Sequence, residues 1–284
     1  MNRRRPTAVL LPEDPLEQRV VDDHYSREKR AAQELGLTVK LANIENLLMG
    51  QNPLKWPPFE NETIIVYRGW MLSDAHYKQL SDSLTAKNAR LYGNPMDYRK
   101  AHHMSEWVDF FSAFTPKTFI PADESPGAIG ACLDLFEHSP LIIRSNTKSF
   151  KEYWDSACFI PRASDRDQAL KVIGRFIELR DDTGLEGILF RAFEKFVGAE
   201  LRSWWINGKH VLTTTHPNSP EEGNPLELTI PVGFEECVFE LGCPFITADF
   251  VRNENGQWRL VEIGDGGVSD LPPTVAPDSL YSKF

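Results

Sequence analysis

The sequence predicts a chain in two parts, an α/β portion followed by an α+β portion with antiparallel hairpins. Short apolar runs alternate with helix-like stretches over the first hundred or so residues, which is typical of a small, mainly parallel sheet with helices on its faces. Further along, two runs of strand length flank Asn207-Gly208, the strongest short hairpin signal, and two more flank residues 253–256. The length of 284 residues agrees with roughly two domains at ~150 residues each.

The composition is that of an ordinary globular protein. Hydrophobic residues make up 41% and charged residues 25%, which excludes a disordered chain. The net charge of -10 argues against a protein whose whole surface binds nucleic acid, although a local basic cleft for phosphate remains open. The four cysteines show no CxxC spacing, so we expect reduced thiols in a cytoplasmic protein.

No membrane segment is expected. No apolar run approaches the ~18 residues that a membrane span needs. The basic opening residues 1–5 resemble the start of a signal peptide, but the apolar stretch that follows ends at Pro12 and is too short for its hydrophobic region. The sequence therefore predicts a soluble, cytoplasmic chain.

The first part is expected to fold as alternating strands and helices. Its expected strands are Thr7–Leu11, Leu37–Leu41, Thr63–Tyr67 and a short one that begins at Leu91-Tyr92. Its expected helices are Val20–Leu35, which Gly36 ends, a helix that Ser73-Asp74 begins and that runs to Ala86, and Asp97–Phe114.

The second part is expected to be α+β. A strand at Leu141–Arg144, a helix at Asp165–Arg180 and a strand at Gly187–Phe193 precede the hairpins. The hairpin strands are Leu201–Ile206 with His210–Thr214, and Phe245–Arg252 with Trp258–Ile263.

Carboxylates in the last hairpin are the most informative chemical feature. Asp249 lies in one apolar strand and Glu262 in its partner, so the two side chains can face each other across the ladder. Facing carboxylates repel unless a hard cation neutralises them, and Asp265 could complete such a site. The alternative is that these are exposed strand carboxylates beside a glycine turn.

Several cations could bind phosphate. Arg144 and Lys148 follow a buried strand and are either surface charges or a phosphate clamp. Glu200 and Arg202 are two residues apart and share a strand face; they either pair with each other, or Arg202 reaches a substrate while Glu200 orients it. Arg191 lies inside an apolar strand and needs a partner if it is buried.

The histidines and the common motifs add little. His102 and His103 are neighbours on an expected helix and point about 100° apart, a poor arrangement for one metal. We interpret them, with His210 and His216, as structural. The chain contains no GxSxG, P-loop or GxGxxG motif.

Taken in order, several stretches resemble a poorly characterised clade of small, single-chain ATP-grasp proteins of bacteria and phages. The ordered series spans roughly Ile64 to the end and is more specific than any one piece. The matching stretches are Tyr67–Trp70, Ile143–Ser149, Trp154–Pro161, Gly187–Phe193, Glu200–Arg202, Ala248–Phe250, Val261–Ser269 and Leu271-Pro272. The chain is also distantly similar to the eukaryotic cell-division-cycle assembly factor of translation initiation, another ATP-grasp relative.

The resemblance implies an ATP-grasp fold with three regions. An N-terminal α/β domain would cover residues 1–118, a small lobe residues 119–186, and a large lobe with the metal-binding hairpin residues 187–284. ATP would be held between the two α+β lobes.

Residue roles also follow from the resemblance. Lys148 would contact the ATP phosphates, with Arg144 where relatives often carry a lysine. The strand Gly187–Phe193 would meet the adenine through its backbone. The expected nucleotide-binding set is Arg144, Lys148, Phe190, Arg191, Ala192, Phe193, Glu200 and Arg202.

The same resemblance implies catalytic and metal-binding residues. Arg191 and Arg202 would point at the triphosphate or at the transferred phosphoryl group and would act in catalysis with Lys148. One or two Mg²⁺ ions would be held by Asp249, Glu262 and Asp265, the last at a position where ATP-grasp enzymes often carry asparagine. Arg68, after a strand end in the first domain, is our candidate for holding a substrate carboxylate.

The implied chemistry is ATP-dependent ligation of a carboxylate to an amine or thiol, through an acylphosphate and with release of ADP. The expected partners are ATP and an unidentified carboxylate and amine substrate, small molecule or peptide. Two alternatives remain: an ATP-binding assembly or chaperone-like factor for a partner protein, and a nucleotidyl- or phosphoryl-transferase acting on protein or RNA.

Overall fold

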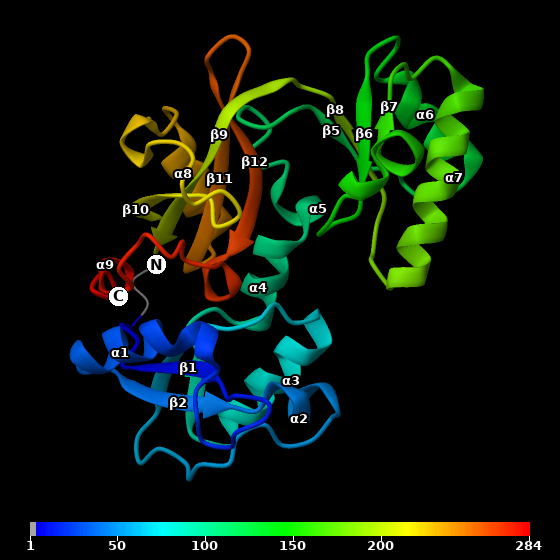
Figure 1. Ribbon diagram of the computed structural model, residues 1–284. Coiled ribbons are helices and arrows are strands. Elements are labelled where there is room, and N and C mark those ends of the chain that lie inside the picture. The colour runs from blue at the N-terminus through cyan, green and yellow to red at the C-terminus, as the bar shows by residue number, and fades with distance from the viewer. Residues whose placement is uncertain (1–3) are drawn as a thin grey trace. The chain divides into compact units, whose positions relative to one another are not determined.

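The computed structural model describes residues 4–284 and contains three four-stranded sheets (Figure 1). The chain divides into two compact units. The first unit comprises the residues up to Ala101 together with Ala199–Phe250 and Glu262–Phe284, and the second comprises His102–Gly198 and Val251–Val261. Within residues 4–284, no helix combines the length and the apolar character that crossing a bilayer requires.

The first sheet is parallel and has the strand order β2-β1-β3-β4. Its strands are β1 (Ala8–Pro12), β2 (Thr38–Ala42), β3 (Thr63–Tyr67) and β4 (Ala89–Leu91). The helices that follow them are α1 (Ser26–Glu34, after the 3-10 turn Asp23–Tyr25), α2 (Ile44–Leu48), α3 (Asp74–Thr85) and α4 (Pro95–His102). The expected α/β pattern of this region is confirmed.

Both faces of the first sheet are buried, as the continuous apolar run of β1 requires. Ala8 and Leu10 pack with α2, α3 and α4 residues on one face. Val9 and Leu11 pack on the other face with α1, with the third sheet through Trp204, and with the C-terminal helix α9 (Asp278–Tyr281). Alternate residues of one strand therefore join the parts of the first unit.

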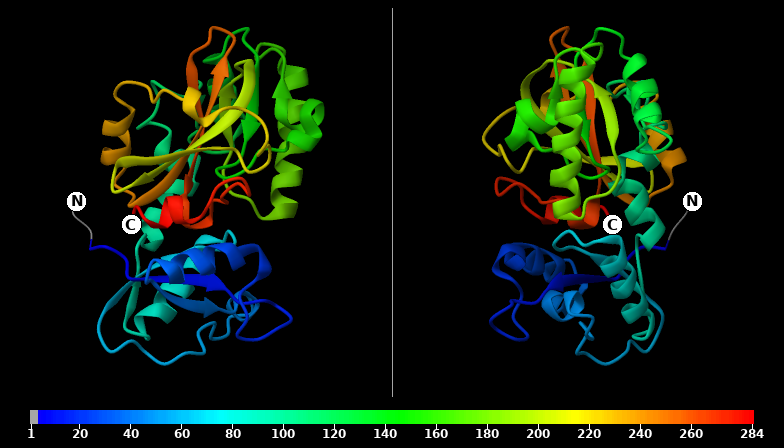
Figure 2. Two further views of the ribbon diagram at one scale, coloured as in Figure 1. Left: turned by 60° about the vertical axis from the view of Figure 1, so that its left-hand side comes forward. Right: turned by 90° about the vertical axis from the view of Figure 1, so that its right-hand side faces the viewer.

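The second sheet lies in the second unit and has the order β5-β8-β6-β7, all antiparallel. Its strands are β5 (Thr118–Phe119), β6 (Leu141–Arg144), β7 (Phe159–Ile160) and β8 (Leu189–Ala192). Leu141, Ile143 and Phe190 point to one face and pack there with α6 (Pro126–Asp134) and α7 (Arg166–Thr183). Figures 1 and 2 show α7 running along this sheet.

The third sheet is built from the two predicted hairpins and has the order β10-β9-β11-β12. Its strands are β9 (Phe196–Ile206), β10 (Lys209–Thr215), β11 (Phe245–Asn253) and β12 (Trp258–Asp265). Asn207 and Gly208 both have positive φ, as the tight hairpin turn requires. One face of the sheet is covered by α8 (Phe234–Leu241), whose Phe234 contacts Trp205 and Phe250.

Two sequence expectations differ from the structure. The expected helix Asp97–Phe114 is broken, because His103 adopts an extended backbone between α4 and α5 (Met104–Trp107), and the first unit also ends there. The strand β8, expected to open the large lobe, instead pairs with β5 and β6. The expected domain boundaries at 118 and 186 thus differ from the unit boundaries near residues 101 and 198.

Candidate functional site

Charged side chains gather on the face of the third sheet that lies opposite α8. On β9, Trp204 packs against the first sheet, so Arg202 and Glu200, at alternate positions, point to the same face. On β11, Phe245 joins the same core, which places Asp249 on that face as well. On β12, Glu262 and Gly264 point to the same face, and a Cβ at Gly264 would meet the hydroxyl of Thr247. Thr247 is two positions from Asp249 on β11, so Glu262 lies on the same face as Asp249. Three neighbouring strands each contribute one carboxylate to this face.

Arg202 and Asp249 form a two-pronged ion pair at the centre of this face. Nε of Arg202 donates to Oδ1 of Asp249 and Nη2 donates to Oδ2, both at 2.8 Å. Nη1 also donates to the backbone carbonyl of Asp270 at 3.4 Å. The two side chains are 11% and 7% exposed, so their geometry is fixed by burial as well as by the fork.

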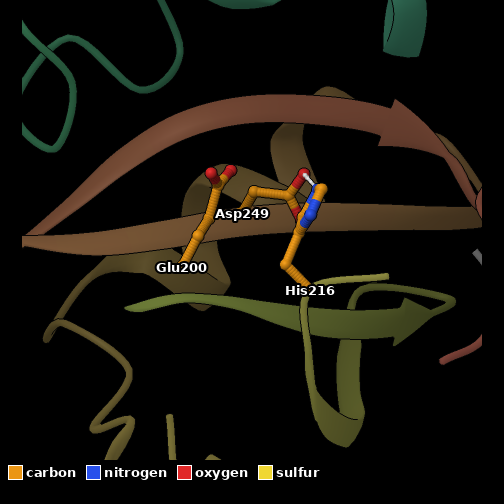
Figure 3. A group of neighbouring side chains, drawn as sticks. All are labelled: Glu200, His216 and Asp249. Carbon is orange, nitrogen blue, oxygen red and sulfur yellow. Dashed lines mark ion pairs between the residues drawn. The ribbon is translucent and has the colours of Figure 1, made fainter. Parts of the chain in front are cut away.

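His216 is a member of the site that sequence reasoning missed. Ligand atoms of Glu200, His216 and Asp249 all lie within 4.8 Å of one another (Figure 3). Nε2 of His216 is 3.7 Å from Oδ2 of Asp249 and 3.2 Å from Nη2 of Arg202, while the Asn218 N–H donates to Nδ1. The structural interpretation of His216 from the sequence is therefore replaced by membership of this group, which we call the Arg202 cluster: Glu200, Arg202, His216, Asp249 and Glu262.

Electrostatics within the Arg202 cluster favour a further cation. Burial lowers the pKa of Arg202, but the charge and hydrogen bonds of Asp249, with the charges of Glu200 and Glu262, outweigh burial and raise that pKa above its ordinary value. Arg202 therefore stays protonated among three carboxylates. With the three carboxylates ionised and His216 neutral, Arg202 balances one of the three negative charges. One divalent cation would balance the other two.

Asp265 does not join the cluster. It is three positions from Glu262 on β12, so the two side chains leave the strand on opposite sides. Oδ1 of Asp265 accepts from the Gly267 N–H and begins the 3-10 turn Gly266–Val268. Burial raises the pKa of Asp265 to about 7, although the Gly267 N–H and Arg68 act to lower it. Asp265 thus caps this turn, and its expected role as a metal ligand stays a prediction.

A pH dependence of stability follows from Asp265. Its pKa is raised from 3.8 to about 7, so the stability tied to the neutral carboxyl is complete below pH ~4 and is lost as the pH rises through ~7. Relative to Asp265→Asn, the wild-type free energy of unfolding should fall by about 4 kcal/mol across that window. Urea unfolding of both proteins between these pH values measures the difference, and a difference that stays constant would contradict the raised pKa.

Arg68 is buried and forms its hydrogen bonds within the first unit. It is 1% exposed, its Nε and Nη2 donate to both oxygens of Glu28 at 2.8 and 2.7 Å, and its Nη1 donates to the carbonyls of Gly266 and Ser269. The Tyr281 hydroxyl donates to the same Glu28 carboxylate. Arg68 thus joins α1, the Gly266–Val268 turn and α9. Its expected role in holding a substrate carboxylate stays a prediction.

In the second unit, two predicted arginines share a face of the sheet. The β6–β8 register pairs Ile142 with Arg191, and Arg144 is in phase with Ile142, so both arginines lie opposite the helix-covered face. Arg191 is 3% exposed and donates to the Thr115 hydroxyl and to the carbonyls of residues 260 and 261. These bonds tie β8 to the β12 hairpin, and the expected contact of Arg191 with phosphate stays a prediction.

The remaining predicted nucleotide-binding residues lie at the ends of β6 and β8. Arg144 is 5% exposed at the end of β6, where its Nε donates to the Ser145 carbonyl. Lys148 is exposed on the turn that the Ser145 hydroxyl closes, and its ammonium forms no ion pair with any residue in 4–284. On β8, Phe190 is buried and Ala192 half-buried, and Phe193 follows the strand, packing on Phe159 and Trp154.

Comparison with known proteins identifies the family. Residues 128–284, more than half of the chain, match the model of the ATP-grasp domain, R-two-K clade family 3. No curated protein sequence matches the chain significantly.

Solved structures show the same fold. The D-cycloserine synthetase DcsG is 14% identical with a TM-score of 0.61, over 97% of this chain and 99% of that one. A RimK domain ATP-grasp protein from Sphaerobacter thermophilus is 13% identical with a TM-score of 0.61, over 97% and 98%. The ATP-grasp ligase PsnB, complexed with minimal precursor, Mg and ADP, is 9% identical with a TM-score of 0.56, over 99% and 98%.

These findings confirm the fold class that the resemblance implied. The α/β first sheet and the two antiparallel sheets stand in the order expected of the fold, and the family match covers the second and third sheets almost entirely. The chain belongs to family 3 of the R-two-K clade of ATP-grasp domains.

Proposed function

We propose that the protein is an ATP- and Mg²⁺-dependent ligase that joins a carboxylate to an amine, or to a similar nucleophile, through an acylphosphate with release of ADP. The observation that carries the proposal is the Arg202 cluster, in which one buried guanidinium lies among three carboxylates on one sheet face. The neighbouring structures named as a synthetase and as a ligase complexed with Mg and ADP support it.

The Arg202 cluster fits a magnesium ion. Carboxylate oxygens are the ligands that Mg²⁺ prefers, and donor atoms of Glu200, His216 and Asp249 already converge within 4.8 Å. Each oxygen of Asp249 uses one lone pair toward Arg202 and keeps another for an ion. We propose Asp249 and Glu262 as the principal ligands, with Glu200 beside them. The ion would neutralise charge on the phosphates and so lower the barrier to phosphoryl transfer.

Arg202 is the proposed catalytic cation. A guanidinium has five N–H donors, of which the Asp249 fork uses two and the Asp270 carbonyl a third, while a fourth, on Nη2, lies toward Nε2 of His216. The remaining N–H can bind an oxygen of the phosphoryl group as it moves. Because the fork and the strand hold the guanidinium rigidly, its charge needs no reorganisation during the reaction.

Other residues are proposed to bind the nucleotide. Lys148, with its exposed ammonium, and Arg144, at the end of β6, are the candidates for phosphate contacts. The backbone that leads from β8 to Phe193 is the candidate for adenine binding.

The proposed reaction has two steps. An oxygen of the substrate carboxylate attacks the γ-phosphorus, and the bond to the ADP oxygen breaks. The amine nitrogen then attacks the acyl carbon, inorganic phosphate leaves with the bonding electrons, and the nitrogen loses a proton. Positioning and neutralisation of charge supply most of the catalysis in phosphoryl transfer, which suits a site of cations and carboxylates.

Binding of ATP should depend on Mg²⁺ through Glu262. We expect Glu262→Gln, which keeps the shape of the side chain and removes its charge, to weaken ATP binding at least about tenfold when Mg²⁺ is present, the size of one lost contact to a charged group. Without Mg²⁺ the variant and the wild type should bind alike. Titration calorimetry measures both conditions.

A matched control is Glu254→Gln, at the tip of the same hairpin, where Glu254 pairs with Lys195 on the surface. Its ATP affinity should equal that of the wild type. If Glu262→Gln binds Mg²⁺ and ATP as tightly as this control does, Glu262 is not a ligand.

A further inference from the structure

A pocket of about 190 Å³ opens in the first unit, apart from the Arg202 cluster. Three carboxylates line it, those of Glu13, Asp22 and Glu45, and its lining includes no Lys, Arg or His. Pro12, Pro15, Ile44 and Trp70 supply apolar walls. A pocket of this size suits one side chain rather than a nucleotide.

The place of this pocket in the sheet is that of a ligand site. Glu13 follows β1, Asn43 and Glu45 follow β2, and Trp70 lies just beyond β3. Strand β1 lies between β2 and β3 with all three parallel, and Figure 1 shows the arrows of β1 and β2 pointing the same way. The chain moves to one side of β1 to form β2 and to the other side to form β3. In open parallel sheets, ligands bind outside the carboxyl ends of the strands at such a reversal.

The three carboxylates of the pocket differ in how many hydrogen bonds they accept from other residues of the protein. Glu13 is 9% exposed, and it accepts from the Arg19 N–H and from the Asn43 amide. Asp22 accepts from the Trp70 indole N–H at 2.9 Å and from a backbone N–H. Glu45 is exposed, and no described residue in 4–284 pairs with its carboxylate. Two carboxylates that the fold holds in place and one that is available to a ligand therefore line the same pocket.

Contacts within the first unit lead from this pocket to the Arg202 cluster. The His24 ring lies against the indole of Trp70, with centroids 4.9 Å apart. Nε2 of His24 is 3.0 Å from Oδ1 of Asp270, and the carbonyl of Asp270 accepts from Arg202. The pocket and the proposed catalytic cation are thus the two ends of one series of contacts.

From these observations we infer that the pocket is a substrate subsite that binds a basic group carried on an alkyl chain, an alkylammonium or alkylguanidinium. The inference rests on the proposed ligase function and adds the chemical class of one substrate. An anionic group would meet three carboxylates, and a purely apolar one would desolvate them without compensation. A cation with an apolar stem satisfies both the carboxylates and the walls, with the indole face of Trp70 adding a cation–π contact.

The test uses the full chain without ATP, so its result does not depend on ligase activity. The signal is the indole N–H resonance of Trp70 in nitrogen-15 spectra, assigned from the spectrum of Trp70→Phe. The probes are L-lysine and L-norleucine, which differ in the terminal ammonium, and the capped peptide acetyl-Ala-Lys-Ala-amide. We expect saturable shifts with lysine and none with norleucine. A shift with the peptide as well indicates a peptide-borne basic group, and its absence indicates a free amino acid.

Variants of Glu45 complete the test. Glu45→Gln should weaken lysine binding several-fold, and Glu45→Lys should abolish it, whereas Glu34→Lys, a reversal on the exposed face of α1, should leave it unchanged. Two results would overturn the inference: equal shifts with lysine and norleucine, or lysine binding that Glu45→Lys leaves intact. Failure of ATP turnover with lysine bound normally would instead count against the ligase function alone.

Discussion

Replacing Arg68 with methionine should lower the free energy of unfolding by about 3–5 kcal/mol, the cost of leaving the partner of a buried ion pair uncompensated. The Glu28 carboxylate is 8% exposed on its side chain and would keep only the Tyr281 hydroxyl among the bonds described above. The carbonyls of Gly266 and Ser269 would lose their shared donor as well. Burial lowers the pKa of Arg68, but Glu28 outweighs burial and raises that pKa above its ordinary value, so the arginine is charged at every pH at which the protein folds.

Urea unfolding of Arg68→Met measures this effect, and Arg90→Met is its matched control. Arg90 pairs with Glu62 at 2.9 Å, but the two side chains are 58% and 46% exposed, and such surface pairs contribute about 0–1 kcal/mol. The double variant Arg68→Met/Glu28→Gln should recover part of the loss, because it removes the charge left without a partner. A loss from Arg68→Met no larger than that from Arg90→Met would show that the Glu28–Arg68–Tyr281 contacts do not hold the first unit together.

The second large effect concerns the reaction. Arg202→Lys should lower turnover at least about tenfold and leave ATP affinity within a small factor, because the proposed contact with the phosphoryl group matters mainly in the transition state. Lysine keeps the charge but cannot form the planar fork that holds Arg202 on Asp249. Steady-state kinetics and calorimetry on the same preparation separate the two quantities.

Arg259→Lys is the control for this substitution. Arg259 forms the same kind of fork, with both oxygens of Glu194 at 2.8 Å, but it lies in the second unit and outside the Arg202 cluster. It should cost stability without changing turnover. If both variants reduce turnover equally, the loss reflects the broken fork in general, and Arg202 has no special role in the transition state.

Much of the fold could be predicted from the sequence because local sequence signals specify individual strands, turns and helix starts. The apolar run Thr7–Leu11, the turn residues Asn207-Gly208 and the N-cap Ser73 each predict what the structure contains. The helix break at His103 was missed because no proline or glycine marks it. The place of β8 was missed because strand partners are set by long-range hydrogen bonds, which adjacent sequence does not reveal.

The place of His216 in the Arg202 cluster could not be predicted from the sequence pattern. A regular two-residue hairpin would place Thr215 opposite Glu200, with His216 on the other face. The register instead shifts between His210 and Leu212, so that Thr214 faces Arg202 and His216 follows in phase opposite Glu200. A β-bulge of one residue exchanges the faces of all later side chains. Nothing in the local sequence signals this bulge.

Strand phase also separates two acidic residues of β12 that the sequence analysis placed in one metal site. Glu262 and Asp265 are near neighbours in sequence, and their odd spacing of three places them on opposite sides of β12. Counting alternate positions along β12 from Glu262 therefore places Asp265 on the other face, away from the cluster. Burial raises the pKa of Asp265 to about 7, and burial depends on packing between distant segments, which cannot be counted along the strand.

The nucleotide released during turnover tests the proposed ligase function most directly. The protein, ATP and Mg²⁺ are incubated with pools of carboxylates and amines that include lysine, and spent nucleotide and product are resolved by chromatography with mass detection. The proposed mechanism predicts one ADP and one phosphate for each new amide bond, and little ATP consumed when the carboxylate is left out. Stoichiometric AMP would instead indicate a nucleotidyl-transferase, and ATP binding without turnover for any pair of substrates would contradict ligation and favour an ATP-binding assembly factor.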